Sequence, residues 1–272
     1  MNILSVDRKL AILTALTEGC SIRSTSRMTG AHIETILKLL VDSGAKAQVM
    51  LDEKMRGIHA EAIECDELWC YIQKKQRRVT VEDRSEHPEY GDAYTFIALD
   101  PATKLVPSFL VGKRDHACTD QFLADLSQRI AGPVQLSTDG FPGYMAGIPR
   151  HFGHRATHAE LIKVYAAENP GPGRYSPPHV TGTQIIERWG IPNRERVCTS
   201  YVERMNLTVR MQIRRFTRLT NAFSRKLDNL KAAVALFFWN WNFCWRPRTI
   251  RVTPAMQAGI TDRVWELREL AV

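Results

Sequence analysis

The spacing of apolar residues changes near residue 57, and this change is the strongest constraint on the fold. Before it, apolar residues recur at helical intervals, as in the segment 7–17, which is typical of a helix with one buried face. After it come three runs rich in strand-forming residues, at 58–72, 93–99 and 105–111. We therefore expect two domains, an all-α domain over residues 1–56 and an α/β domain over residues 57–272.

The first domain is predicted to contain three helices, at 7–17, 22–28 and 32–43. Gly19 and Gly30 follow the first two helices and Ser21 precedes the second, and these residue types favour helix ends and starts. Two short helices joined by a tight glycine turn are typical of a helix-turn-helix, whose second helix enters the DNA major groove. Any three-helix bundle would give the same pattern, so that alternative stays open. The outward polar residues of the third helix are the candidate DNA contacts: His32, Thr35 and Lys38.

The second domain is predicted to be a mixed sheet flanked by helices. The turn Asp100–Lys104 joins the second and third strands into an antiparallel hairpin. Further elements are expected in this order: a helix over 119–130, strands over 134–137 and 161–165, and a long helix from Tyr201. Three antiparallel strands, then helix, strand, helix, strand and final helix is the element order of a ribonuclease H-like α/β domain. Residues 169–196 contain five prolines and little periodicity, and we interpret them as a loop insertion close to the active site.

Three acidic residues occupy positions where acids need an explanation. Asp66 lies within the apolar strand segment Ile63–Trp69, Asp139 stands where a short strand breaks into a turn, and Glu203 comes early in a helix. An acid inside a hydrophobic strand is costly to bury unless it is paired or binds a cation. Each acid also has an ordinary explanation: a strand edge for Asp66, a turn for Asp139, and the helix dipole for Glu203. Their joint placement on the first strand, the fourth strand and the final helix favours one shared site.

A divalent cation would relieve the repulsion among three such carboxylates. Mg²⁺ prefers oxygen ligands and keeps several waters that a substrate can displace. Two divalent ions together can activate an attacking hydroxyl and stabilise the leaving oxygen at a phosphodiester. We therefore predict that Asp66, Asp139 and Glu203 are the catalytic metal ligands, holding Mg²⁺ or Mn²⁺ as a pair of ions.

The predicted helix from Tyr201 carries Glu203 and several basic residues. At helical spacing, one stripe is apolar and predicted to be buried: Val202, Met205, Val209, Ile213 and Phe216. Residues 194–226 contain nine Lys or Arg and two Glu, a net charge of +7 out of +8 for the whole chain. This concentration favours contact with a phosphate backbone, with a merely solvated helix as the alternative. The candidate DNA contacts here are Arg204, Asn206, Arg210, Arg214, Arg215 and Arg218.

Bulk composition is consistent with an intracellular, nucleic-acid-binding protein. The isoelectric point near 9.3 favours an anionic partner, although a basic protein without a polyanionic ligand would have the same value. The six cysteines form no C-x-x-C pair, which indicates reduced thiols. We expect no signal peptide, because no basic segment followed by an apolar run opens the chain.

Five segments carry a resemblance to a known family: Cys65–Trp69, Ser137–Gly140, Ser200–Asn206, Arg215–Ser224 and Arg251–Met256. With them, the chain from about residue 58 to 262 resembles the insertion-sequence-one family of transposases. The resemblance implies a ribonuclease H-like fold, a DDE metal site on Asp66, Asp139 and Glu203, and cleavage and joining of DNA at transposon ends. It further implies transposon ends and target DNA as partners, at least a homodimer when two ends are paired, and a place in the bacterial cytoplasm at the nucleoid.

Two other functions stay open: a catalytically inactive, domesticated DNA-binding regulator, and a nuclease of the same fold that cuts DNA without joining it.

Two further motifs give weaker indications of a function. The spacing of His151, His154 and His158 would suit a metal, but no carboxylate or thiol partner is obvious in the sequence nearby. Trp189 could stack on an unpaired base, although packing beneath a loop explains it more simply.

Overall fold

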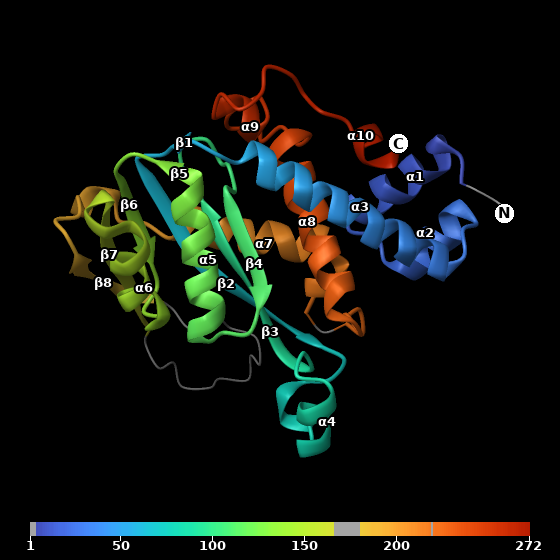
Figure 1. Ribbon diagram of the computed structural model, residues 1–272, viewed down its shortest axis with the longest axis horizontal. Coiled ribbons are helices and arrows are strands. Elements are labelled where there is room, and N and C mark those ends of the chain that lie inside the picture. The colour runs from blue at the N-terminus through green and yellow to red at the C-terminus, as the bar shows by residue number, and fades with distance from the viewer. Residues whose placement is uncertain (1–3, 166–179, 219) are drawn as a thin grey trace.

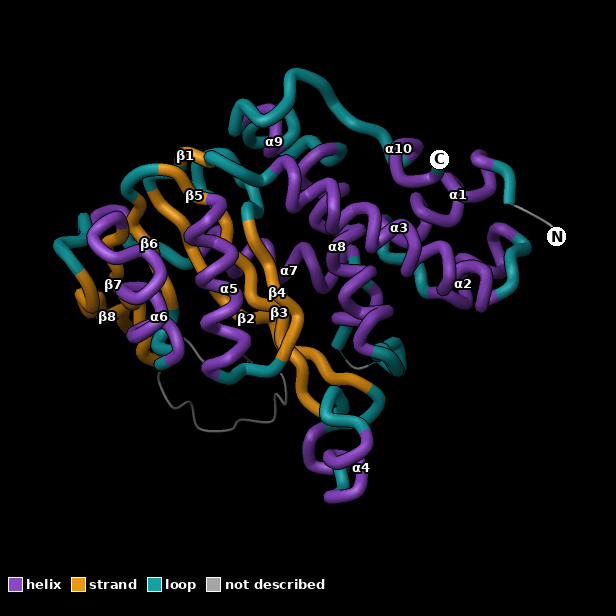
Figure 2. Tube along the Cα trace, in the orientation of Figure 1, coloured by secondary structure: helices purple, strands orange, loops and turns teal. Residues whose placement is uncertain are grey.

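The structure, a computed structural model, describes residues 4–165, 180–218 and 220–272. In this part of the chain, a six-stranded mixed sheet has helices on both faces (Figures 1 and 2). The strand order is β4-β3-β2-β6-β7-β8. The bounds are β2 (Ala62–Ile72), β3 (Gly91–Leu99), β4 (Ser108–Gly112), β6 (Val134–Thr138), β7 (Ala156–Tyr165) and β8 (Val180–Trp189).

The direction of the strands divides the sheet at β2. On one side, β2, β3 and β4 are antiparallel neighbours. On the other, β6 runs parallel to β2, β7 runs parallel to β6, and β8 returns antiparallel to β7. Because β2 and β6 are parallel, their carboxyl-terminal ends point to the same edge of the sheet, which is where ligands bind in open α/β sheets.

Two layers of helices cover the sheet. Helices α5 (His116–Arg129) and α6 (Gly143–Phe152) pack on one face, where Phe122 of α5 and Tyr144 of α6 share a core with Cys65 of β2. Helix α7 (Ser200–Gln212) packs on the other face, where Val202 and Met205 contact the side of β2 that carries Leu68, Cys70 and Ile72. Helix α8 (Leu227–Phe243) contributes to both cores.

The first three helices lie beside α8 rather than over the sheet (Figure 1). They are α1 (Val6–Thr17), α2 (Ile22–Thr29) and α3 (Ile33–Lys54). Gly44 marks the contact of α3 with α8, because a Cβ built at this position would lie 2.5 Å from Cα of Ala232. Helix α3 begins shortly after the turn at Gly30, and its second half packs on α8 as part of the main core.

Smaller elements complete the described chain. They are the two-stranded parallel pair β1 (Ile58–His59) and β5 (Ile130–Ala131), α4 (Val81–Glu86), α9 (Pro254–Gln257) and α10 (Arg268–Ala271). The C-terminus returns to α1, where Nζ of Lys9 donates to the Ala271 carbonyl at 2.8 Å. No helix of the described residues is both long and apolar enough to cross a membrane.

The structure confirms the predicted α/β class, with a mixed central sheet flanked by helices. The hairpin of β3 and β4 is also confirmed, as is the buried stripe of α5 at Phe122, Leu123, Leu126 and Ile130. Helix α3 continues to Lys54, well beyond the predicted end at residue 43, because its second half packs on α8.

The prediction of a continuous loop over residues 169–196 is wrong for residues 180–189, which form β8. This strand pairs with the edge of β7. Its backbone hydrogen bonds to β7 stabilise it, so its own sequence needs no regular pattern of apolar residues. Most of its residues are exposed, which explains the lack of apolar alternation. The prolines at 170, 172, 177 and 178 lie outside the described residues.

Candidate functional site

The parallel pairing of β2 with β6 brings two of the predicted acids together. Glu64 of β2 stands opposite Ser137 of β6 in this ladder. Asp66 and Asp139 each follow two residues later, so they reach the same edge of the sheet. The Asp139 carboxylate also accepts a hydrogen bond from the Phe141 backbone N–H at 2.9 Å, which fixes the turn after β6. The ladder register is therefore the physical cause of their proximity.

Asp66 is held by its own strand and by α7. Its Oδ1 accepts from the Glu67 backbone N–H at 2.7 Å, and its Oδ2 accepts from Nδ2 of Asn206 at 2.7 Å. Burial, together with the nearby carboxylates of Asp139 and Glu203, raises the pKa of Asp66 to about 6. An acid with this pKa is mostly ionised at neutral pH and gains from a bound cation.

Glu64 fixes the start of α7 against the same face of β2. Its Oε2 accepts from the backbone N–H groups of Tyr201 and Val202, at 2.8 and 2.9 Å. These are N–H groups that a helix leaves without internal partners at its first turn. Burial raises the pKa of Glu64, opposed by these hydrogen bonds. Glu64 therefore positions the helix that carries Asn206 and Glu203.

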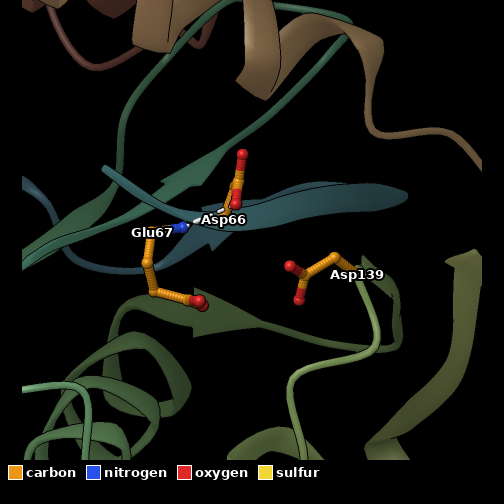
Figure 3. A group of neighbouring side chains, drawn as sticks. All are labelled: Asp66, Glu67 and Asp139. Carbon is orange, nitrogen blue, oxygen red and sulfur yellow. Dashed lines mark hydrogen bonds between the residues drawn. The ribbon is translucent and has the colours of Figure 1, made fainter. Parts of the chain in front are cut away.

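Glu67, which the sequence analysis did not select, completes a cluster of three acids with Asp66 and Asp139. One carboxylate oxygen from each of the three lies within 4.8 Å of the others. Figure 3 shows Asp66 and Glu67 leaving β2 in opposite directions, with Asp139 beside them. This spacing and the all-oxygen donor set fit a hard divalent cation such as Mg²⁺ or Mn²⁺.

The two oxygens of Glu67 already have protein partners. The Tyr144 hydroxyl donates to Oε1, and Nε of Arg114 donates to Oε2 at 3.0 Å. Burial raises the pKa of Glu67 to about 7, opposed by the hydrogen bond from Tyr144. Arg114 also lies 3.7 Å from Oδ2 of Asp139 and 4.0 Å from the ring centre of Phe141. Arg114 thus places one positive charge between Glu67 and Asp139.

Glu203 lies on α7 beside the cluster but is not one of its three members. Nζ of Lys163, from β7, contacts both of its carboxylate oxygens, and the Thr199 hydroxyl donates to Oε1 at 2.8 Å. Asn206, about one helical turn further along α7, is the residue that reaches Asp66. The carboxylate of Glu203 is therefore near enough to affect the pKa of Asp66 while it is paired with Lys163.

Comparison of the chain with known protein families and with curated proteins finds no match.

The predicted DNA-contacting residues fall into two groups. His32, Thr35 and Lys38 are exposed at the start of α3. Along and after α7, three arginines are exposed: Arg204, Arg214 and Arg218. Three others are half-buried: Asn206 at the cluster, Arg210 with Nη1 3.4 Å from the Phe216 carbonyl, and Arg215 with Nη1 2.9 Å from Oγ of Ser224. The buried stripe predicted for this helix is confirmed, although α7 itself ends at Gln212.

The remaining candidates are part of the framework. His158 is buried in β7, where Nε2 lies 2.9 Å from the Thr138 hydroxyl and burial lowers its pKa to about 4. His151 pairs with Asp120 of α5 at 2.8 Å, a carboxylate partner that sequence distance had hidden. Trp189 is 40% exposed, and its Nε1 donates to the Gly153 carbonyl at 2.8 Å. The three histidines therefore do not form a shared metal site.

Proposed function

We propose that this protein is a DDE transposase that cuts and joins DNA at the ends of an insertion sequence. The observation that carries the proposal is the β2–β6 register, which sets Asp66 beside Asp139 and next to a helix carrying Glu203. The reaction is hydrolysis of a phosphodiester to free a 3′ hydroxyl, followed by attack of that hydroxyl on target DNA. Such a protein acts on DNA at the bacterial nucleoid.

A ribonuclease H-like fold for the domain is supported by the order and direction of its strands. Three antiparallel strands, β2 to β4, are followed by two strands parallel to β2, with α5 and α6 between them and α7 after them. This is the element order expected from the sequence, with β8 added at the edge beyond β7. The proposed catalytic acids then fall on the first strand, after the fourth strand and on the helix that closes the domain.

In the proposed metal site, Asp66 and Asp139 are the first ligands, and Glu203 completes the set once it leaves Lys163. A bound pair of Mg²⁺ or Mn²⁺ ions would acidify the attacking hydroxyl and balance charge on the leaving oxygen. Asn206 orients Asp66, and Glu64 holds α7 in place for both Asn206 and Glu203. Lys163 and Arg114 supply positive charge next to the position of the reacting phosphate.

DNA binding is proposed for two surfaces. The first is the helix-turn-helix formed by α2 and α3, where the turn residue Gly30 has φ +64° and the exposed start of α3 carries His32, Thr35 and Lys38. The second is the basic surface of α7 and the residues after it, which holds nearly all of the net charge. Pairing two DNA ends would require at least a dimer.

The test is an assay of wild type and Asp66→Asn on labelled DNA that includes the sequence flanking the reading frame, with Mg²⁺. We expect wild type to give nicked and joined products, and Asp66→Asn to lose both by at least about 10³-fold while it still binds DNA. The matched control is Glu61→Gln, an exposed acid next to β2 that pairs with Arg196.

Each outcome decides between functions. Nicked product without joined product would identify a nuclease of this fold, and binding without either product would identify a DNA-binding regulator. Normal joining by Asp66→Asn would refute the proposed site.

A further inference from the structure

A cavity of about 1040 Å³ lies between the first helices and the segment that joins α7 to α8. Its walls come from the first turn of α2, the start of α3, residues 213–215 and 220–223 with Arg225, and the middle of α8. These elements meet beside α8 in Figure 1. The cavity is separate from the carboxylate cluster, and it is bordered by both proposed DNA-binding surfaces.

Four arginines line this cavity: Arg23, Arg214, Arg215 and Arg225. No acidic residue of the described chain lines it. Arg23, Arg214 and Arg225 are exposed and form no ion pair within the described residues. We call this space the arginine cavity. Four positive charges, with no acidic residue among the described lining residues, favour an anionic ligand.

Arg215 gives a second, independent reason to expect an anionic ligand. Its Nη1 donates to Oγ of Ser224, whereas its Nη2 is buried without an acceptor among the described residues. Burial lowers the pKa of Arg215 to about 10, so the guanidinium stays charged at neutral pH. A buried guanidinium N–H is costly to leave unbonded, and a ligand oxygen would satisfy it.

The lining of the cavity combines apolar and polar residues. Ile33 and Leu37 of α3 and Phe237 of α8 are among the apolar ones. The first turn of α2 also lines the cavity; Oγ of Ser21 caps the Ser24 N–H at 3.0 Å, and the N–H groups of Ile22 and Arg23 have no partners within the helix. Deoxyribose can pack on an apolar wall while its phosphates meet arginines and N–H groups, which is the combination that nucleic-acid backbone binding requires.

Helix α7 connects the arginine cavity to the carboxylate cluster. From Glu203 to Gln212 the helix spans about 14 Å at 1.5 Å per residue, and the cavity begins at the next residue, Ile213. The loop after α1 packs directly on the end of α7, because a Cβ at Gly19 would lie 2.7 Å from the Met211 carbonyl oxygen. At 3.4 Å per nucleotide, 14 Å corresponds to about four nucleotides of a DNA strand.

We propose that the arginine cavity binds the phosphodiester backbone of the DNA strand about four nucleotides from the bond that is cut. This inference rests on the proposed function for the position of the cut, and it adds Arg23 and Arg225 to the DNA-binding surface. The cavity thereby sets the distance between the DNA held by the first helices and the catalytic acids.

The test measures DNA binding by the full chain in EDTA over a range of salt concentrations. We compare wild type with the double variant Arg23→Ala/Arg225→Ala, and with the control Arg77→Ala/Arg78→Ala, which removes two exposed arginines that do not line the cavity. The slope of log Kobs against log salt is negative, and each lost phosphate contact lowers its magnitude by about 0.9. We expect the double variant to lower it by nearly two on every DNA sequence, and the control to leave it unchanged.

A scan of single methylphosphonates along the DNA then locates the contact. We expect one position, about four nucleotides from the cut, where the neutral linkage weakens wild type but not the double variant. An unchanged slope for Arg23→Ala/Arg225→Ala in a protein that still cuts DNA overturns the inference and leaves the proposed function intact. A lowered slope in a protein that binds but never cuts supports the cavity and refutes the transposase. A wild type that binds no DNA refutes both.

Discussion

The two faces of β2 carry acids with very different partners. On the face toward α7, Glu64 binds the first backbone N–H groups of the helix and Asp66 binds Asn206. On the face toward α5 and α6, Glu67 binds the Tyr144 hydroxyl and Arg114. The first pair of acids is tied to one basic helix, whereas Glu67 is tied to the framework on the other side of the sheet.

This difference indicates distinct roles for adjacent acids. The pKa of Asp66 is about 6 and that of Glu67 about 7, because both are buried. Near neutral pH, Asp66 is therefore the more fully ionised of the two, and its partner on α7 is a neutral amide. We infer that Asp66 is a metal ligand and that Glu67 is a positioning residue, which holds Arg114 near Asp139.

The largest expected effect comes from replacing one acid on each side of the sheet, Glu203 on α7, which covers one face of β2, and Glu67 on the other face of β2. Glu203→Gln removes the third proposed ligand, so strand cleavage should fall by at least about 10³-fold. Glu67→Gln keeps the size of a residue outside the ligand set but replaces one of its two acceptor oxygens with an NH2 group, so cleavage should fall by about 10- to 100-fold. Cleavage rates under single-turnover conditions measure both. Equal losses would contradict the assignment of different roles to the two faces.

A smaller effect is expected on stability from Glu64. Glu64→Ala removes the acceptor for two N–H groups at the start of α7 and leaves them buried, which should lower the free energy of unfolding by about 2–3 kcal/mol. Urea denaturation measures this change. Glu61→Gln, on the exposed approach to the same strand, is the control and should be neutral. A neutral Glu64→Ala would show that α7 is held by its apolar stripe alone.

The last expected effect is a pH dependence that belongs to Glu67. Its pKa is raised from 4.5 to about 7, so the folded protein keeps a proton that the unfolded chain has lost. The free energy of unfolding should therefore fall as pH rises from about 4.5 to 7, and Glu67→Gln should remove this part of the slope. Denaturation of both proteins in EDTA at several pH values gives the difference. A difference that grows in favour of wild type with rising pH would have the wrong sign.

Much of the fold could be predicted from local patterns. The β3–β4 hairpin follows from a turn sequence between two strand runs, and the buried stripes of α5 and α7 follow from helical spacing. Strand β8 could not be predicted this way, because its residues are mostly exposed and show no apolar alternation. The strand is stabilised by its backbone pairing with β7, which the local sequence does not reveal. The full length of α3 likewise depends on its contact with α8.

The site was predictable only in part. Asp66 and Asp139 stood out because an acid in an apolar strand and an acid after a short strand are each unusual, and the structure brings them together. Glu67 could not be predicted as part of the site, because side chains alternate along a strand and Glu67 therefore points away from Asp66, toward Tyr144 of α6. Lys163 and Arg114 were hidden because their acidic partners lie 40 and 47 residues away in sequence.

Binding of Mn²⁺, measured by calorimetry on wild type, Asp139→Asn, Glu203→Gln and Glu67→Gln, tests the central claim most directly. The metal is proposed to be held by Asp66, Asp139 and Glu203, with Glu203 released from Lys163. Asp139→Asn and Glu203→Gln should therefore weaken binding by more than about tenfold, and Glu67→Gln by less. If Glu67→Gln abolishes binding while Glu203→Gln binds like wild type, the metal belongs to Asp66, Glu67 and Asp139 and the claim is wrong.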